Sequence, residues 1–130
     1  MRINYVCMMS AALKYDLVRA SPRWRKKGPR YDCVLINGPD QLEFAKVYGC
    51  FTVHFSSVTH RVALIHRYQF VGRHQSSEYI ELQDGGDFDF IFIDTIIRLV
   101  HILPPSTYNS HFTVQDLQSP DIHLRLESLQ

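Results

Sequence analysis

Cysteine, tryptophan and glycine are scarce in this chain of 130 residues, and it has no long apolar run. Its three cysteines are widely separated and odd in number, which argues against a secreted disulfide framework and favours a reducing compartment. No stretch approaches the ~20 apolar residues that a membrane-spanning helix needs. The short apolar stretch YVCMMSAAL is followed by Lys14, Asp16 and Arg19, where a cleavable leader needs small neutral residues. We therefore expect an intracellular protein with no membrane association.

Known catalytic and phosphate-binding motifs are also absent: the sequence has no GxSxG elbow, no Walker-type phosphate loop and no HExxH zinc motif. His54, His60 and His66 recur at intervals of six. Six residues of one strand span ~20 Å, which is too far for two such histidines to share a metal. Asp87 and Asp89 lie on one face of a predicted strand and are interpreted as a solvent-facing acidic edge. The sequence thus predicts no catalytic residue, no metal and no cofactor.

Positive charge is concentrated near the beginning of the chain, although the net charge is only +1. Residues 1–30 hold eight Lys or Arg against a single acid, whereas residues 31–130 hold six against twelve acids. The charged and aromatic members of the densest stretch, SPRWRKKGPR, are Arg23, Trp24, Arg25, Lys26, Lys27 and Arg30. Because Pro22 and Pro29 disfavour helical geometry at the residues before them, we expect residues 20–30 to be an extended connector.

Three interpretations of this basic segment remain open. In the first, its cations contact the phosphates of a nucleic acid while Trp24 stacks on a base. In the second, the segment is a solvated linker. In the third, it docks on the acidic body of the same chain, with Trp24 filling a groove. The shortness of the segment and the acidity of the body weigh against nucleic-acid binding.

From Tyr31 onward, apolar and polar residues alternate in the way that is typical of β-strands. We expect strands over residues 31–37, 43–55, 60–70, 88–94 and 95–103, short terminal pieces, and a polar loop over 71–87. In the second strand, Gly49 interrupts an inward-facing row as a bulge or bend would. The members of that row are Ala45, Val47, Phe51, Val53 and Phe55, and Phe90 and Ile65 are also expected to face the interior.

This pattern predicts a mainly β domain over residues 31–130, either a small SH3-like barrel or a curved antiparallel sheet. A basic N-terminal extension, residues 1–30, precedes it. Apolar residues at near-helical spacing predict a short helix over residues 5–19 of that extension. The same apolar segment could serve homo-oligomerisation, as a swapped or dimer-forming helix.

Several phrases of the sequence carry a resemblance to a known group of proteins: PRWRKKGPRYDCVLIN, EFAKVYGCFTV, HRVALIHRYQ, FIFIDTIIRLVHILPP and SPDIHLRL. Together they resemble a β domain encoded in many copies in mushroom-forming fungi, beside or fused to large DNA transposons of the KDZ type. The resemblance covers residues 22–126, with departures at 71–87 and in LVHILPP, and it implies mobile-element ancestry without catalytic residues. More distantly, the order of strands is similar to SH3-like barrels of the bromo-adjacent homology type in chromatin proteins, an analogy of fold alone.

We therefore predict a non-catalytic interaction module of fungal mobile-element origin, which would act in the nucleus. Its predicted partner is acidic, either nucleic acid or a chromatin-type protein, and its predicted binding residues are Arg23, Trp24, Arg25, Lys26, Lys27 and Arg30. The alternative is a peptide-binding barrel whose aromatic groove is formed by Tyr31, Tyr48, Phe51 and Tyr68. A decayed mobile-element copy without activity is a further alternative, and an enzyme is the least favoured.

Overall fold

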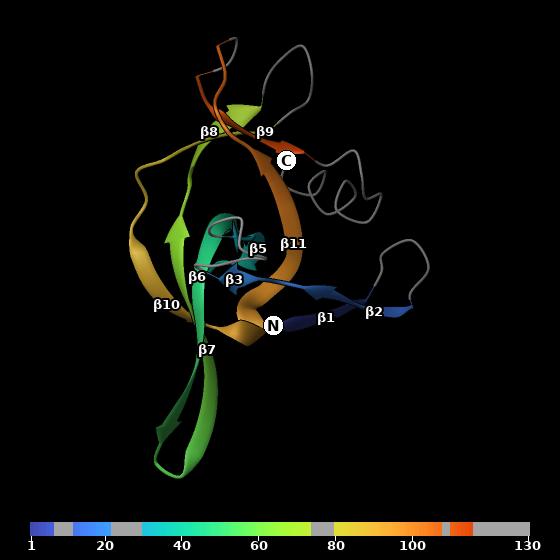
Figure 1. Cartoon of the computed structure of the whole chain (residues 1–130), viewed down its shortest axis with the longest axis vertical. Coiled ribbons are helices and arrows are strands. Elements are labelled where there is room, and N and C mark those ends of the chain that lie inside the picture. Colours follow the sequence, from blue (N-terminus) through green and yellow to red (C-terminus); the bar gives the residue numbers. More distant parts are fainter. Residues whose placement is uncertain (7–11, 22–29, 74–79, 108–109, 116–130) are drawn as a thin grey trace.

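β-Strands make up most of the described part of the chain, which comprises residues 1–6, 12–21, 30–73, 80–107 and 110–115 of a computed structural model (Figure 1). In chain order the elements are β1 (Arg2–Val6), β2 (Leu13–Leu17), β3 (Ala20–Ser21), β4 (Arg30–Tyr31), β5 (Cys33–Asn37), β6 (Leu42–Phe55), β7 (Val58–Arg67), β8 (Gln69–Arg73), β9 (Ile80–Gln83), β10 (Phe88–Phe92), the 3₁₀ turn η1 (Ile93–Thr95), β11 (Ile96–Leu103) and β12 (Phe112–Gln115). No helix in these ranges is long and apolar enough to span a membrane. The prediction of a mainly β fold is confirmed.

Eight of the strands form one antiparallel sheet in the order β10-β7-β6-β5-β11-β12-β9-β8. β10 and β7 lie at one end of this order, and β9 and β8 lie at the other. Because β8 directly follows β7 in the chain and β10 directly follows β9, the chain passes twice from one end of the sheet to the other. The sheet is strongly curved (Figure 1). Among the described strands, β10 and β8 each pair with one neighbour only, and the ladder stays open. The curved-sheet alternative is therefore the one observed, and these strands do not close into an SH3-like barrel.

β5 lies between two hydrophobic clusters, because both of its faces are buried. Val34 and Ile36 point into the first cluster, together with Val47 of β6 and Ile65 of β7. Leu35 points into the second cluster, which β9 and β12 complete from the other side. A strand with a continuous apolar run cannot leave either face to water. Both faces of the sheet centre are therefore covered.

The first two strands form a hairpin, and the short helix predicted over residues 5–19 is not formed by the described part of that segment. β1 pairs antiparallel with β2, with Ile3 opposite Asp16, and Ile3 is buried in the first cluster. The Asp16 carboxylate accepts hydrogen bonds from the Arg98 Nε at 2.7 Å and from the Leu99 backbone N–H at 2.9 Å. This ion pair is nearly buried and holds the hairpin against β11. Tertiary packing thus overrides the local helical spacing.

The polar stretch of residues 71–87, predicted to be a loop, contributes to two strands. β8 continues to Arg73, and β9 pairs with it in antiparallel register. Ile80 and Leu82 of β9 are buried in the second cluster. Two apolar residues spaced two apart are too short a run to be recognised among polar turn residues, which is why the prediction was wrong here.

Candidate interaction surface

β6 exchanges its inward and outward sides at a β-bulge. Val47 pairs with Ile65 and Gly49 pairs with Leu64, so Tyr48 is an extra residue without a counterpart in β7. One extra residue moves every later side chain of the strand to the opposite face of the sheet. The predicted bulge at Gly49 is confirmed, and its consequence for the rest of the strand is larger than predicted.

Beyond the bulge, the predicted inward row is wrong. Phe51, Val53 and Phe55 are 49%, 45% and 71% exposed. Phe90, which was also expected inside, is 62% exposed, whereas Ile65 is fully buried as predicted. In β6 the alternation was continued in the same phase through a bulge that reverses it, and residues 50–55 are exposed on both faces of the strand. Phe90 lies on β10, an end strand of the sheet, where the bulge plays no part.

The reversal creates a continuous apolar surface over three neighbouring strands, β6, β7 and β10. Strand register places Phe51, Val62 and Phe92 side by side across these strands. The exposed apolar side chains on this side of the sheet will be called the aromatic face, and they are Phe51, Val53, Phe55, Val58, Phe88, Phe90 and Phe92. A groove of about 710 Å³ runs over them, with a mainly apolar lining.

Ring contacts connect the strands of the aromatic face at three successive levels. The centroid distances are 5.5 Å for Tyr48–Phe88, 6.3 Å for Phe51–Phe90 and 5.6 Å for His60–Phe92. These distances fall within the range of favourable aromatic pairs. The rings in these pairs are thereby held by a neighbour before any partner arrives, which lowers the entropy cost of binding.

The outer half of the β6–β7 hairpin, residues 50–61, extends beyond the rest of the sheet (Figure 1) and will be called the arm. One side of the arm belongs to the aromatic face. The other side is polar, and there the Thr59 Oγ1 lies 3.0 Å from the His54 Nδ1. At the tip, Ser56 and Ser57 both have positive φ, 48° and 64°, as a two-residue turn of type I′ requires. The arm is therefore an amphipathic two-stranded ribbon.

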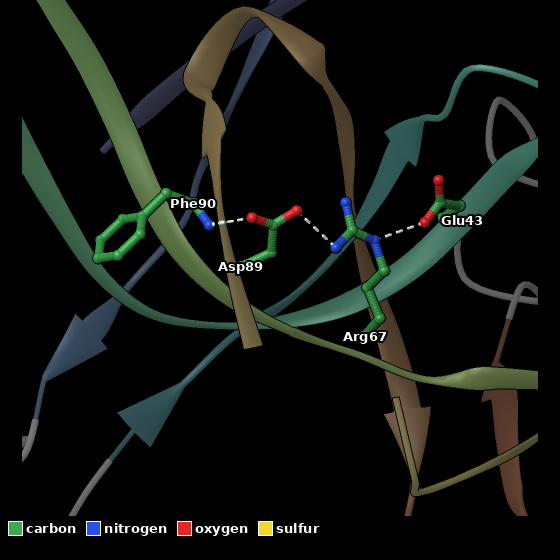
Figure 2. Close-up of polar contacts among 4 residues, drawn as sticks. All are labelled: Glu43, Arg67, Asp89 and Phe90. Atoms are coloured by element: carbon green, nitrogen blue, oxygen red, sulfur yellow. Dashed lines mark hydrogen bonds and ion pairs between the residues drawn. The ribbon is translucent and has the colours of Figure 1, made fainter. Parts of the chain in front are cut away.

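An ion-pair network fixes β10 against β6 and β7. Figure 2 shows Arg67 donating through Nε to Glu43 at 2.6 Å and through Nη1 to Asp89 at 2.8 Å. The Asp89 carboxylate also accepts the backbone N–H of Phe90 at 2.8 Å. The hydrogen bond from Arg67 and, to a smaller extent, the one from the Phe90 backbone lower the pKa of Asp89 below its ordinary value. Asp87 lies beside the edge strand β10 and Asp89 lies on it, and both are exposed, so the acidic edge is where it was predicted. Asp89, however, is paired with Arg67.

The four residues of the predicted peptide groove do not come together. Tyr31 contacts Tyr48 with ring centroids 4.8 Å apart, and Phe51 lies further along β6 on the aromatic face. Tyr68 packs against the second core cluster instead, with its hydroxyl 3.8 Å from the Cys33 Sγ. Burial raises the pKa of Tyr68 and of the Cys33 thiol, so both stay protonated at neutral pH. Tyr31, Tyr48 and Phe51 therefore lie along the aromatic face or beside its inner end, and Tyr68 lies elsewhere.

The basic segment leaves and re-enters the fold at one place. The predicted binding residues outside the described ranges are Arg23, Trp24, Arg25, Lys26 and Lys27. Ser21 of β3 pairs with Arg30 of β4, so the two ends of the segment lie side by side in extended conformation, and residues 22–29 of the predicted connector lie outside the described ranges. The Asp32 carboxylate accepts bonds from the Arg30 Nε at 3.2 Å and from the Arg19 backbone N–H at 2.7 Å. These contacts fasten the base of the segment.

Two histidines of β7 contact the aromatic face. Within the described ranges, no three His, Cys, Asp or Glu side chains lie close enough together to hold a metal ion. His60 and His66 share one side of β7, as predicted, and each contacts a phenylalanine ring: Phe92 at 5.6 Å and Phe88 at 4.5 Å. These imidazoles extend the aromatic surface.

Sequence reasoning missed most of the aromatic face as a functional surface. Phe51, Val53, Phe55 and Phe90 were assigned to the interior. For the residues of β6 the available signal was Gly49: once a bulge is predicted there, the phase of that strand must be reversed after it. The same reversal would have moved Phe51 from the core to the surface.

Comparisons of the chain with protein-family models, with curated proteins and with solved structures give no match. The resemblance to the transposon-associated β domain of mushroom-forming fungi therefore stays a prediction about ancestry. Function is inferred from the aromatic face and from the sequence of the basic segment.

Proposed function

We propose that this domain is a non-catalytic interaction module that docks a partner protein on its aromatic face. The observation that carries the proposal is the exposure of five phenylalanines on one side of three neighbouring strands. An aromatic side chain presents roughly 150–250 Å², and these five are 49–71% exposed. They leave on the order of 600 Å² open. The largest apolar patch of an ordinary monomer is roughly 300–600 Å² and is often functional.

The chemistry of the groove suits binding better than catalysis. Its lining includes one titratable side chain, His60, whereas general acid–base catalysis works through groups positioned to exchange a proton with a substrate. Rings held by neighbouring rings, on a strand fixed by the Arg67 network, supply rigid contact area. Rigid aromatic anchors of this kind dominate the energetics of many protein interfaces.

The test is selection of binding peptides from a random library on the full chain, followed by affinity measurements. We expect apolar peptides whose affinity changes little with salt, because apolar contacts are not screened. Phe90→Glu should abolish this binding, since it places a carboxylate in the groove. Leu13→Glu is the matched control, because Leu13 is an exposed apolar residue on β2. Peptides that bind Phe90→Glu as tightly as the natural chain would contradict the proposal.

A second function is favoured by the way the basic segment is held. Its ends are joined through β3 and β4, and Tyr31 of β4 contacts Tyr48, so the described ends of the segment lie near the inner end of the aromatic face. We propose that its cations and Trp24 contact an acidic partner, either nucleic acid or a chromatin-type protein, in the nucleus. Mobile-element ancestry, as the resemblance implies, agrees with such a partner.

Salt dependence separates this second function from the first. Binding of a nucleic-acid duplex through the basic segment should weaken steeply with salt, with a slope that reports the number of phosphates contacted. Lys26→Glu combined with Lys27→Glu should reduce that slope by about two units and leave peptide binding on the aromatic face unchanged. Nucleic-acid binding that is insensitive to both substitutions would exclude this role.

A further inference from the structure

We propose that the partner docked on the aromatic face is a second copy of this chain, an inference that rests on the docking role proposed above. Two copies would face each other through the same surface, related by a twofold axis. Each arm would then lie on the aromatic face of the other copy. Every contact of such an isologous interface occurs twice, so a modest surface contributes doubly.

The size of the aromatic face matches one side of a homodimer interface. A stable interface buries roughly 800 Å² per partner, and about 65% of a homodimer interface is apolar. The five phenylalanines leave on the order of 600 Å² uncovered, and the exposed valines Val53 and Val58 add to it. One aromatic face therefore supplies the apolar area that one partner must contribute.

The arm carries its charge on the side away from the aromatic face. Arg61 pairs in register with Thr52 on the polar side, and Asp89 is already engaged by Arg67. A twofold axis would bring like charges on this surface toward each other, which opposes association. Because the groove presents His60 as its one titratable group, two copies can meet without burying a fixed charge. Transient interfaces between different proteins are more polar than this.

The two sides of the arm differ in whether another layer of structure must pack on them. The polar side, with its bond between Thr59 and His54, is suited to water. The apolar side is a face of a ribbon that is only two strands wide near its tip, and such ribbons are marginally stable alone in water. Packing two apolar sides together gives each ribbon the second layer that a stable β structure needs. A second copy supplies that layer with matching chemistry.

Sedimentation velocity of the full chain over a range of concentrations tests the inference. We expect the natural chain to change from monomer to dimer as its concentration rises. Phe55→Glu and Phe90→Glu each place two carboxylates in the symmetric interface, so each should raise the dimer dissociation constant on the order of a hundredfold. Leu13→Glu, at a residue that is 74% exposed on β2, should leave the constant unchanged. Circular dichroism in dilute solution checks that each variant keeps its β structure.

Each contrary outcome has a distinct meaning. A natural chain that stays monomeric at its highest soluble concentration overturns the inference, and so does a dimer that survives both Phe55→Glu and Phe90→Glu. A dimer lost in Leu13→Glu would place the interface on the N-terminal strands, where the sequence predicted self-association, and would also overturn it. In all three cases the docking role survives if library peptides still bind the natural chain and not Phe90→Glu. If the peptides ignore that substitution, the docking role itself fails.

Discussion

The inner and outer halves of β6 are similarly apolar, yet one is core and the other is surface. Phe44 and Val47 are buried before the bulge, whereas Val53 and Phe55 face water after it. A single extra residue, Tyr48, separates the two halves. Other parts of the chain pack on both faces of the inner half, whereas both faces of the outer half are exposed. Burial along this strand is thus decided by the layers that cover it and not by the hydrophobicity of its residues.

The largest expected effect compares two phenylalanines of the same strand. Phe44→Ala should lower the free energy of unfolding by about 4 kcal/mol, because it opens a cavity in the second cluster. Phe55→Ala should cost less than about 0.5 kcal/mol, since the ring is exposed. Urea denaturation in dilute solution, where association does not contribute, measures both. Similar losses for the two variants would break the comparison.

A smaller loss is expected from removal of the contact that holds the covering hairpin on the inner half. Asp16→Ala removes the carboxylate that pairs with the nearly buried Arg98 guanidinium and should cost about 3 kcal/mol. The double variant Asp16→Leu with Arg98→Met removes both charges and should recover much of the loss. Urea denaturation of the three chains gives the comparison. A double variant no more stable than Asp16→Ala would show that the uncompensated charge is not the cause.

A gain is expected at the tip of the arm. Ser56 and Ser57 both occupy the left-handed region, which costs ordinary L-residues roughly 1 kcal/mol each. Replacing them by Asn and Gly, the preferred pair for this turn, should stabilise the arm by about 1 kcal/mol. Amide hydrogen exchange should slow in the arm and stay unchanged in the inner half of β6. Equal slowing in both halves would mean that they open as one unit.

The smallest effect concerns the pH dependence of the Arg67 network. Because the pKa of Asp89 is lowered in the folded chain, its contribution to stability is present above its ordinary unfolded pKa of about 4. That contribution is lost as the pH falls through the lowered value. Asp89→Asn should therefore be less stable than the natural chain at neutral pH and converge with it in acid. Urea midpoints that differ equally at both pH values would contradict this assignment.

The strands could be predicted from the sequence because their signal is local. Alternation located β5, β6, β7, β10 and β11, and Gly49 correctly marked the bulge. The side that faces inward is not a local property, because it depends on which layers cover the sheet. Phe90 was therefore placed inside although it lies on an edge strand with one open face.

The N-terminal strands show the same limit in another form. Their apolar spacing fits a helix as well as it fits strands, so the local pattern does not decide between them. What decides is a contact between Asp16 and Arg98, which lie far apart in the sequence. Among the residues predicted to form a peptide groove, Tyr31 and Tyr48 are in contact, whereas Tyr68 packs against the second cluster, a position that its aromatic character alone does not reveal.

Thiol labelling of Val53→Cys tests most directly whether the aromatic face is open on one chain and covered by a second copy. Peptide mass analysis separates the new thiol from the natural cysteines, and Val47→Cys, on the buried half of β6, is the control. We expect rapid labelling of Val53→Cys in dilute solution, slower labelling as the concentration rises, and no labelling of Val47→Cys. Protection of Val53→Cys even in dilute solution, or a rate that is the same at every concentration, would contradict the account.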